Sequence, residues 1–85
     1  MSNDVQRIIK GELIGKEVTI KDSENKANVG IAGKIIDETK YTLTVRTKDG
    51  NKKVLLKKQN TLTFGQVTVN GTALIGRPEE RIKNN

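Results

Sequence analysis

The sequence predicts an all-β protein folded as a small antiparallel barrel. Residues 31–36 and 42–46 each alternate apolar and polar side chains, and a short polar turn joins them. This pattern is typical of a hairpin with one buried face. Gly33 falls inside the first run, where glycine permits a sharp bend or a close backbone approach. Valine, isoleucine and threonine are frequent and there is one proline, which favours strands over helices. Because a strongly bent central strand lets a small sheet close on itself, we expect a barrel.

An amphipathic helix is predicted before the sheet, within residues 1–15. From residue 2 to residue 14 apolar residues recur at near-helical spacing and form one stripe, made of Val5, Ile8, Ile9 and Leu13. Asn3 or Asp4 is suited to cap the start of this helix, and Gly15 to end it. A helix this short is not stable alone, so its stripe must pack on the barrel or on another protein.

The barrel itself is expected within residues 16–75. Besides the central hairpin, strands are predicted at 17–21, 52–58, 61–64 and 66–69, with a short edge strand at 72–75. Two dipeptides favour tight hairpin turns, namely Asp49-Gly50 and Asn70-Gly71.

A short C-terminal helix is predicted within residues 76–85. Pro78 suits the first position of a helix, and Glu79 and Glu80 follow in the first turn, where negative charge is favourable. Ile82 is expected to dock this helix on the barrel, and the last two residues are expected to fray.

The length leaves room for one domain, residues 1–85, and the charge of that domain suggests an anionic partner. Sixteen Lys and Arg against ten Asp and Glu give a formal net charge of +6 and a pI near 9.8. On so small a domain this favours an anionic polymer such as a nucleic acid. Solubility, or a lysine-rich proteome, is the alternative explanation.

Composition argues against catalysis, metal binding and disulfides. The chain has no cysteine and no histidine, which removes the usual thiolate ligands and the usual general base. Two carboxylate pairs remain, Asp37-Glu38 and Glu79-Glu80. Neighbours in a turn point in different directions, and helix-start electrostatics explains the second pair. We therefore predict no catalytic residue, no metal ligand and no cofactor.

No stretch approaches the roughly 20 apolar residues that a membrane span needs, and none resembles a signal peptide. We expect a soluble, cytoplasmic protein without a membrane partner.

Basic residues gather between Lys40 and Lys58, with Asp49 as the lone acid. Several occupy outward positions of adjacent strands, so a barrel would collect them on one side as a phosphate-binding face. Protection of exposed strands against edge-to-edge aggregation is the alternative. Tyr41 and Phe64 are the only rings, too few to stack successive bases. We therefore expect contacts with the phosphates and shape of a folded RNA or a duplex, with Phe64 in the core. Tyr41 either stacks on one base or is an ordinary turn residue.

Four segments, taken in order, carry a recognisable pattern. They are Glu12-Leu13-Ile14-Gly15, Val29-Gly30-Ile31-x-Gly33-Lys34-Ile35-Ile36-Asp37-Glu38-Thr39, Thr42-Leu43 and Gly71-x-x-Leu74-Ile75-Gly76-Arg77-Pro78-Glu79-Glu80-Arg81-Ile82-Lys83. Together they resemble the archaeal ribonuclease P protein component 1 family over nearly the whole chain. The resemblance implies a strongly bent, six-stranded, Sm-like (SH3-like) barrel flanked by terminal helices.

The same resemblance implies a non-catalytic subunit of ribonuclease P. In that enzyme the RNA cleaves the 5′ leader from precursor tRNA and holds the magnesium ions. The implied partners are the ribonuclease P RNA, precursor tRNA, a small zinc-ribbon subunit and the other ribonuclease P proteins. Two departures stand out. Lys10-Gly11 replaces a basic residue followed by histidine, and Asn70-Gly71 replaces the second Sm signature, which disfavours a ring-forming Sm protein.

The residues expected to bind RNA phosphates are Lys34, Arg46, Lys52, Lys53, Lys57, Lys58, Arg77 and Arg81. Those expected to meet the protein partner are Val5, Ile8, Ile9 and Ile36. Ile36 lies on the strand face opposite Ile35, so the N-terminal helix covers it or a partner does. Two alternative functions stay open: another structured-RNA-binding barrel such as a ribosomal protein, and a protein-interaction module whose charge only serves solubility.

Overall fold

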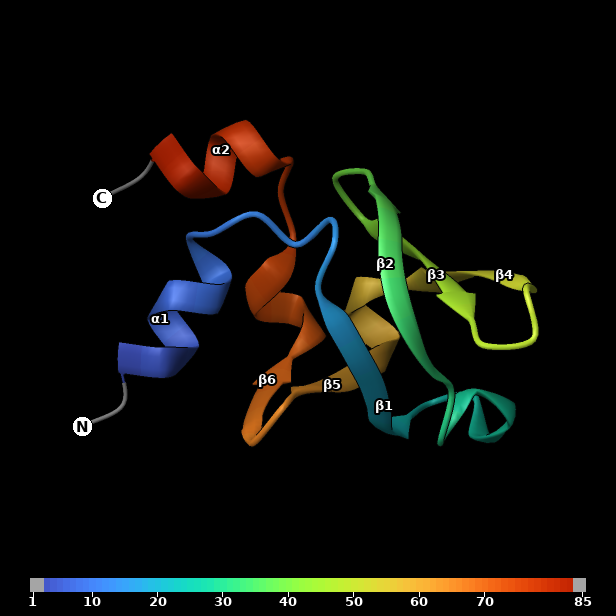
Figure 1. Ribbon diagram of the computed structural model, residues 1–85. Coiled ribbons are helices and arrows are strands. Elements are labelled where there is room, and N and C mark those ends of the chain that lie inside the picture. The colour runs from blue at the N-terminus through green and yellow to red at the C-terminus, as the bar shows by residue number, and fades with distance from the viewer. Residues whose placement is uncertain (1–2, 84–85) are drawn as a thin grey trace.

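The computed structural model describes residues 3–83, and within them the chain forms six strands, two α-helices and three 3₁₀-helices (Figure 1). The α-helices are α1 (Asn3–Ile9) and α2 (Pro78–Lys83). The strands are β1 (Glu17–Ser23), β2 (Ala32–Glu38), β3 (Thr42–Thr47), β4 (Lys52–Leu56), β5 (Asn60–Phe64) and β6 (Val67–Asn70). The 3₁₀-helices are η1 (Lys26–Asn28), η2 (Lys57–Gln59) and η3 (Gly71–Leu74). The predicted all-β class with short terminal helices is confirmed.

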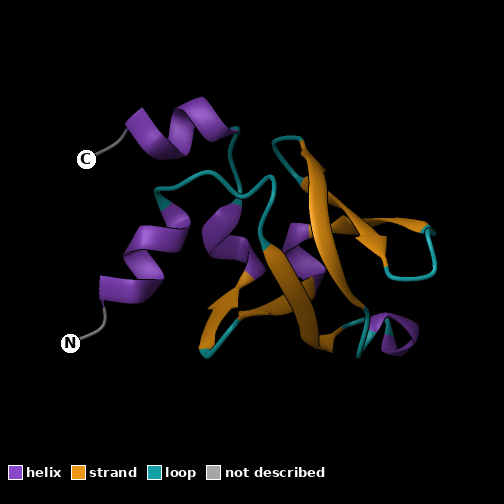
Figure 2. Cartoon of the chain, in the orientation of Figure 1, coloured by secondary structure: helices purple, strands orange, loops and turns teal. Residues whose placement is uncertain are grey.

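All six strands join one antiparallel sheet in the order β4-β3-β2-β1-β5-β6. The long, curved β2 crosses the middle of the molecule, and α1 and α2 lie together on the side away from the β3–β4 hairpin (Figures 1 and 2). Within residues 3–83 no ladder joins the edge strands β4 and β6, so the sheet is curled but not closed. Instead η2, which follows β4, packs against η3, which follows β6.

Two features of β2 bend the middle of the sheet. Gly33 in β2 is buried, and a Cβ there would overlap the carbonyl oxygen of Arg46, so the predicted close backbone approach is confirmed. Farther along, the β2–β3 pairing steps from Ile35 to Asp37 and leaves Ile36 as a bulge. The extra residue shifts the alternation by one position, so Glu38 is buried and Asp37 is exposed.

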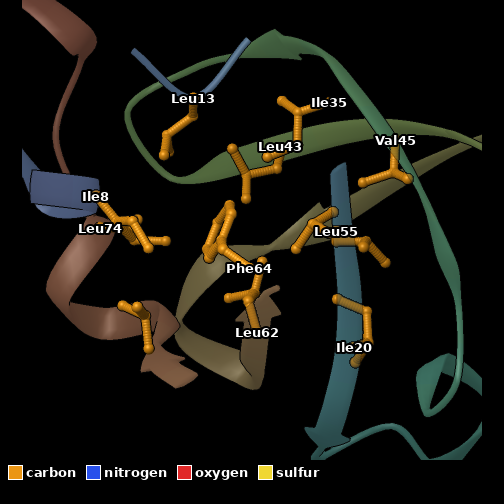
Figure 3. Packing of buried hydrophobic residues seen from close by; sticks show 12 residues of the cluster. Ile8, Leu13, Ile20, Ile35, Leu43, Val45, Leu55, Leu62, Phe64 and Leu74 are labelled. Carbon is orange, nitrogen blue, oxygen red and sulfur yellow. The ribbon is translucent and has the colours of Figure 1, made fainter. Parts of the chain in front are cut away.

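The hydrophobic core lies inside the curl of the sheet and is completed by residues from outside it. Figure 3 shows side chains of the strands converging with Ile8 of α1, Leu13 of the following segment and Leu74 of η3. The buried members are Ile8, Leu13, Val18, Ile20, Ile35, Leu43, Val45, Leu55, Leu62, Phe64, Val69 and Leu74. Each such side chain stabilises the fold by roughly 1.5–3 kcal/mol through burial. Phe64 is in the core, as expected, and the stripe of α1 packs on the same core.

The N-terminal helix is shorter than predicted. It ends at Ile9 rather than near residue 14, and the chain turns at Lys10 and Gly11. Glycine is a poor helix former, and a Cβ at Gly11 would lie 2.7 Å from the carbonyl oxygen of Arg7. Leu13 still reaches the core, but from the irregular segment that follows the helix. The predicted helix start at residue 2 lies outside the described residues.

The predicted Asn70-Gly71 turn and the edge strand at 72–75 are wrong. Asn70 caps η3, because its Oδ1 accepts a hydrogen bond from the Thr72 amide at 3.0 Å. Gly71 lacks the positive φ that the turn requires. A Cβ at Gly71 would overlap the carbonyl oxygen of Lys57, so glycine serves here to let η3 meet η2. The fourth strand likewise ends at Leu56, before η2, rather than at residue 58.

The C-terminal helix begins at Pro78 as predicted. Glu80 accepts a hydrogen bond from the Arg77 amide at 2.9 Å, and this bond lowers the pKa of the Glu80 carboxyl. Ile82 does not dock the helix, because its side chain is 38 % exposed. The inward residue is Arg81. The last two residues of the chain lie outside the described part, as does any fraying there. Among residues 3–83, no helix is both long and apolar enough to cross a membrane.

Candidate nucleic-acid interface

Three cations form a row across three neighbouring strands. Lys34 of β2 lies opposite Arg46 of β3, and Arg46 lies opposite Lys52 of β4. All three are exposed on the outer face of the sheet, and we call them the basic row. Glu17 of β1 lies opposite Lys34 and ends the row on one side. The register thus places three predicted RNA-binding residues side by side.

An acid lies opposite the row only at its Lys34 end, so like charges face each other along the rest of it. Directly opposed residues on one face of a sheet have Cβ atoms roughly 4.5–5.5 Å apart, and like charges at that spacing repel. None of the three side chains makes an ion pair within the described chain. A phosphate placed over the row would relieve the repulsion, because it adds the missing opposite charge.

The other exposed members of the predicted set lie elsewhere. Lys53 pairs with Val45, whose side chain is in the core, so Lys53 and Lys52 are on opposite faces of β4. Lys58 is exposed in η2, and Arg77 is exposed just before α2. These three cations therefore do not extend the basic row.

Lys57 and Arg81 do not belong to the surface. Their side chains are 0 % and 4 % exposed, and both bind the carboxylate of Glu38. Lys57 Nζ lies 2.8 Å from Glu38 Oε2, and Arg81 Nη2 lies 2.7 and 2.6 Å from the two carboxylate oxygens. The expectation that Lys57 and Arg81 contact RNA phosphates is therefore corrected: their donors face a buried carboxylate. We call these three residues the buried ion cluster.

The cluster ties separate segments together. Lys57 Nζ also donates to the carbonyl oxygens of Thr39 and Gly76, at 2.8 and 3.0 Å. Arg81 Nη1 donates to the carbonyl oxygens of Ile9 and Gly11, at 2.6 and 3.1 Å. The cluster thus joins the β2–β3 turn, η2, α2 and the end of α1. Burial lowers the pKa of the Lys57 ammonium, while its bond to Glu38 acts in the opposite direction.

Alternation in the sequence is enough to place Lys57 on the inner face, but not to place Glu38 or Arg81 beside it. Leu55 is buried, and simple alternation from it places Lys57 on the inner face of the sheet. The inward position of Glu38 depends on the bulge at Ile36, which no residue pattern marks. The pairing with Arg81 joins residues 43 positions apart, so it follows from the tertiary fold alone.

The predicted protein-partner residues are mostly engaged within the chain. Ile8 is buried in the core, so the expectation that it meets a partner is corrected. Val5 and Ile9 are half-buried and pack against the same core. Ile36 is half-buried at the bulge. More exposed apolar side chains lie elsewhere, among them Tyr41 and Leu56.

A curled antiparallel sheet with a row of exposed cations on its outer face is typical of small β-fold proteins that bind nucleic acids. Comparison with known proteins identifies the family within this class. The family model described as "Ribonuclease P/MRP, subunit p29" matches residues 6–84. The chain therefore belongs to this family and is by descent a ribonuclease P protein subunit, which associates with the enzyme's RNA and its other proteins.

Individual relatives agree with this assignment. Ribonuclease P protein component 1 of Methanocaldococcus jannaschii is 45% identical over 80 residues, which cover 89% of this chain and 84% of the relative. The protein of the same name from Thermofilum pendens is 40% identical over 83 residues, covering 92% and 88%. The solved structure of Mth11, described as a homologue of human RNase P protein Rpp29, aligns with a TM-score of 0.59 and 39% identity. That alignment covers 84% of this chain and 97% of Mth11.

Proposed function

We propose that this chain binds the folded RNA of ribonuclease P through the basic row, while the RNA itself cleaves the 5′ leader from precursor tRNA. The observation that carries the proposal is the direct opposition of Lys34, Arg46 and Lys52 across three strands. A folded RNA brings phosphates close together, and their repulsion falls when fixed cations lie between them. Because the backbone ladders fix the Cα positions of the three residues, only their side chains have to be ordered on binding.

The proposed mode of binding is recognition of phosphates rather than of base sequence. Contacts to phosphates position a protein on a nucleic acid and make its affinity depend on salt. Each neutralised phosphate changes the slope of log affinity against log salt by roughly 0.7–0.9. The basic row alone therefore accounts for a slope of about −2 to −3.

We further propose where the remaining partners bind. The accessible parts of the half-buried Val5 and Ile9 on α1, and of the half-buried Ile36 on β2, contact a zinc-ribbon protein subunit. Lys53, Lys58 and Arg77 contact phosphates beyond the row, on the ribonuclease P RNA or on precursor tRNA. We place this activity in the cytoplasm and assign residues 1–85 to one folded unit.

Replacing the row by alanine tests the proposal. The variant Lys34→Ala, Arg46→Ala, Lys52→Ala should bind transcribed ribonuclease P RNA at least tenfold more weakly in a filter-binding titration at low salt. The matched control is Lys16→Ala, Lys21→Ala, Lys26→Ala, which removes the same charge from exposed positions outside the row. Equal loss of affinity in both variants would show that net charge alone matters and would overturn the assignment of the row.

A further inference from the structure

Tyr41 is an exposed ring between two hollows of the surface. It follows β2 in the β2–β3 turn, and 54% of it is accessible. The hollow of ≈ 500 Å³ on one side is lined by Tyr41, Leu56, Lys58 and Ile75. The hollow of ≈ 460 Å³ on the other side includes Lys40, Arg77 and Glu79. Neither hollow includes a residue of the basic row.

The backbone of the turn that carries the ring is held by hydrogen bonds from Gly76 and from Lys57 of the buried ion cluster. The carbonyl oxygen of Lys40 accepts from the Gly76 amide at 2.8 Å, and that of Tyr41 accepts from the Lys57 amide at 2.8 Å. Lys57 Nζ also donates to the carbonyl oxygens of Thr39 and Lys40, at 2.8 and 3.2 Å. These bonds fix the backbone from which the ring projects, so a planar ligand has to order only the Tyr41 side chain.

The chemistry around the ring is an apolar floor beside several cations. Leu56 is 40 % exposed and Ile75 is half-buried, so both present aliphatic surface to the first hollow. Lys58 is the charged residue of that hollow. Lys40 Nζ lies 5.5 Å from the centre of the Tyr41 ring, and Arg77 lines the second hollow, where Glu79 is the exposed acid. A flat apolar ligand that carries negative charge complements this arrangement.

We propose that the hollow formed by Tyr41, Leu56 and Ile75 takes one unpaired nucleotide of an RNA. The base stacks on the Tyr41 ring over the aliphatic floor, and Lys58 contacts a flanking phosphate. This inference rests on the proposed RNA-binding function and adds a second contact of a different kind to the basic row. An apolar protein segment fits the position less well, because it would leave Lys40, Lys58 and Arg77 without negative partners.

Intrinsic fluorescence tests the stacking directly. The chain has one tyrosine and no tryptophan, so tyrosine emission reports Tyr41 alone. A short oligouridylate should quench this emission saturably, whereas an abasic ribose-phosphate oligomer of the same length should bind without quenching. Equal quenching by both oligomers, or none by either, would overturn the proposal.

Substitution provides the matching affinity test. Tyr41→Ala should weaken binding of labelled oligouridylate by about fivefold or more, the lower end of what one stacked base contributes. Tyr41→Phe should keep the wild-type affinity because the ring is retained. Val54→Ala is the matched control, since Val54 is an exposed apolar residue that lines neither hollow. If Tyr41→Ala binds oligouridylate as tightly as the wild type, the hollow does not hold a base and the proposal is overturned. This is the result expected if the hollow binds a protein segment instead.

The two proposals fail in different ways. If the row variant still weakens binding of folded RNA while Tyr41→Ala leaves oligouridylate binding unchanged, only the nucleotide hollow is overturned. If neither the oligomers nor the folded RNA bind the wild-type chain at low salt, both proposals are overturned.

Discussion

The guanidinium of Arg81 lies 2.6 Å from a carboxylate oxygen of Glu38, and both side chains are shielded from solvent. Arg81 belongs to α2 and Glu38 to the end of β2, 43 positions earlier in the chain. Through the same guanidinium, Arg81 reaches the carbonyl oxygens at the end of α1. Arg81 therefore links both terminal helices to the sheet, and α1 is held in addition by the packing of Ile8 on the core. The apolar residue of α2, Ile82, remains partly exposed, so charge rather than apolar burial positions this helix.

Glu38→Gln should destabilise the protein strongly. The substitution removes the one carboxylate that faces Lys57 and Arg81 and leaves two buried cations without their partner. Breaking a buried ion pair from one side costs about 3–5 kcal/mol, so urea-induced unfolding should show a loss of that size. The control is Glu79→Gln in the exposed first turn of α2, which should change the free energy of unfolding by less than about 0.5 kcal/mol. A loss under about 1 kcal/mol for Glu38→Gln would contradict the role of the cluster.

Lys57 should make stability rise with pH in the alkaline range. Burial lowers the pKa of its ammonium below the ordinary value of 10.5, so between these two values the unfolded chain binds more protons than the folded one. Stability increases with pH wherever the unfolded state holds more protons. The cost of keeping the charged ammonium buried is therefore fully present below the folded-state pKa and declines as the pH rises from there toward 10.5.

The comparison that isolates this effect uses Lys57→Met, which keeps an unbranched side chain one atom shorter and removes the titrating group. Free energies of unfolding are measured for both proteins from neutral pH to about pH 10, just below the ordinary lysine pKa. The wild type should gain stability relative to Lys57→Met as the pH rises. A difference that stays constant, or one that falls, would show that the folded state does not lower this pKa.

Sequence patterns predicted the strands well because alternation is a local property. Leu43, Val45 and Leu62 face the core as their period-two spacing requires. Gly33 was expected to allow a close approach of backbone, and Arg46 provides it. These features depend on near neighbours in the chain, which one sequence displays.

The predictions that the structure corrects concern contacts between segments that are distant in the sequence. The bulge at Ile36 turns Glu38 inward, and this converts Lys57 and Arg81 from surface cations into internal ones. Gly71 was interpreted as a turn glycine because it follows Asn70, whereas its smallness serves the contact with Lys57. The basic row was predicted residue by residue, but its register across β2, β3 and β4 is visible only in the fold.

Gly71→Ala should destabilise the protein although it adds only one methyl group. The added Cβ would overlap the carbonyl oxygen of Lys57 and would also lie 2.6 Å from that of Asn60. Backbone atoms cannot move aside as the end of a flexible side chain can, so η2 and η3 must move apart. Overpacking of this kind typically costs about 1–3 kcal/mol.

Thermal unfolding measures this loss. For a chain of this size a loss of 1 kcal/mol lowers the midpoint by roughly 4–8 °C. Ala73→Ser, an exposed change in the same 3₁₀-helix, should leave the midpoint within about 2 °C. A Gly71→Ala protein as stable as the wild type would mean that η3 does not approach η2 as closely as described.

The salt dependence of RNA binding should distinguish the basic row from the remaining cations. If Lys34, Arg46 and Lys52 each neutralise one phosphate, removing all three should make the log–log slope of affinity against salt shallower by about 2–3. The control has Lys16, Lys21 and Lys26 replaced by alanine. Both variants lose three of the six net positive charges, so their long-range attraction to RNA is matched. The slope of the control should change by less than about 1, because counterion release requires contact rather than net charge. Filter-binding titrations of transcribed ribonuclease P RNA at several salt concentrations provide both slopes. Equal slopes for the two variants would mean that the cations act through the overall electrostatic field of the protein. The opposition of three charges across β2, β3 and β4 would then have no part in binding.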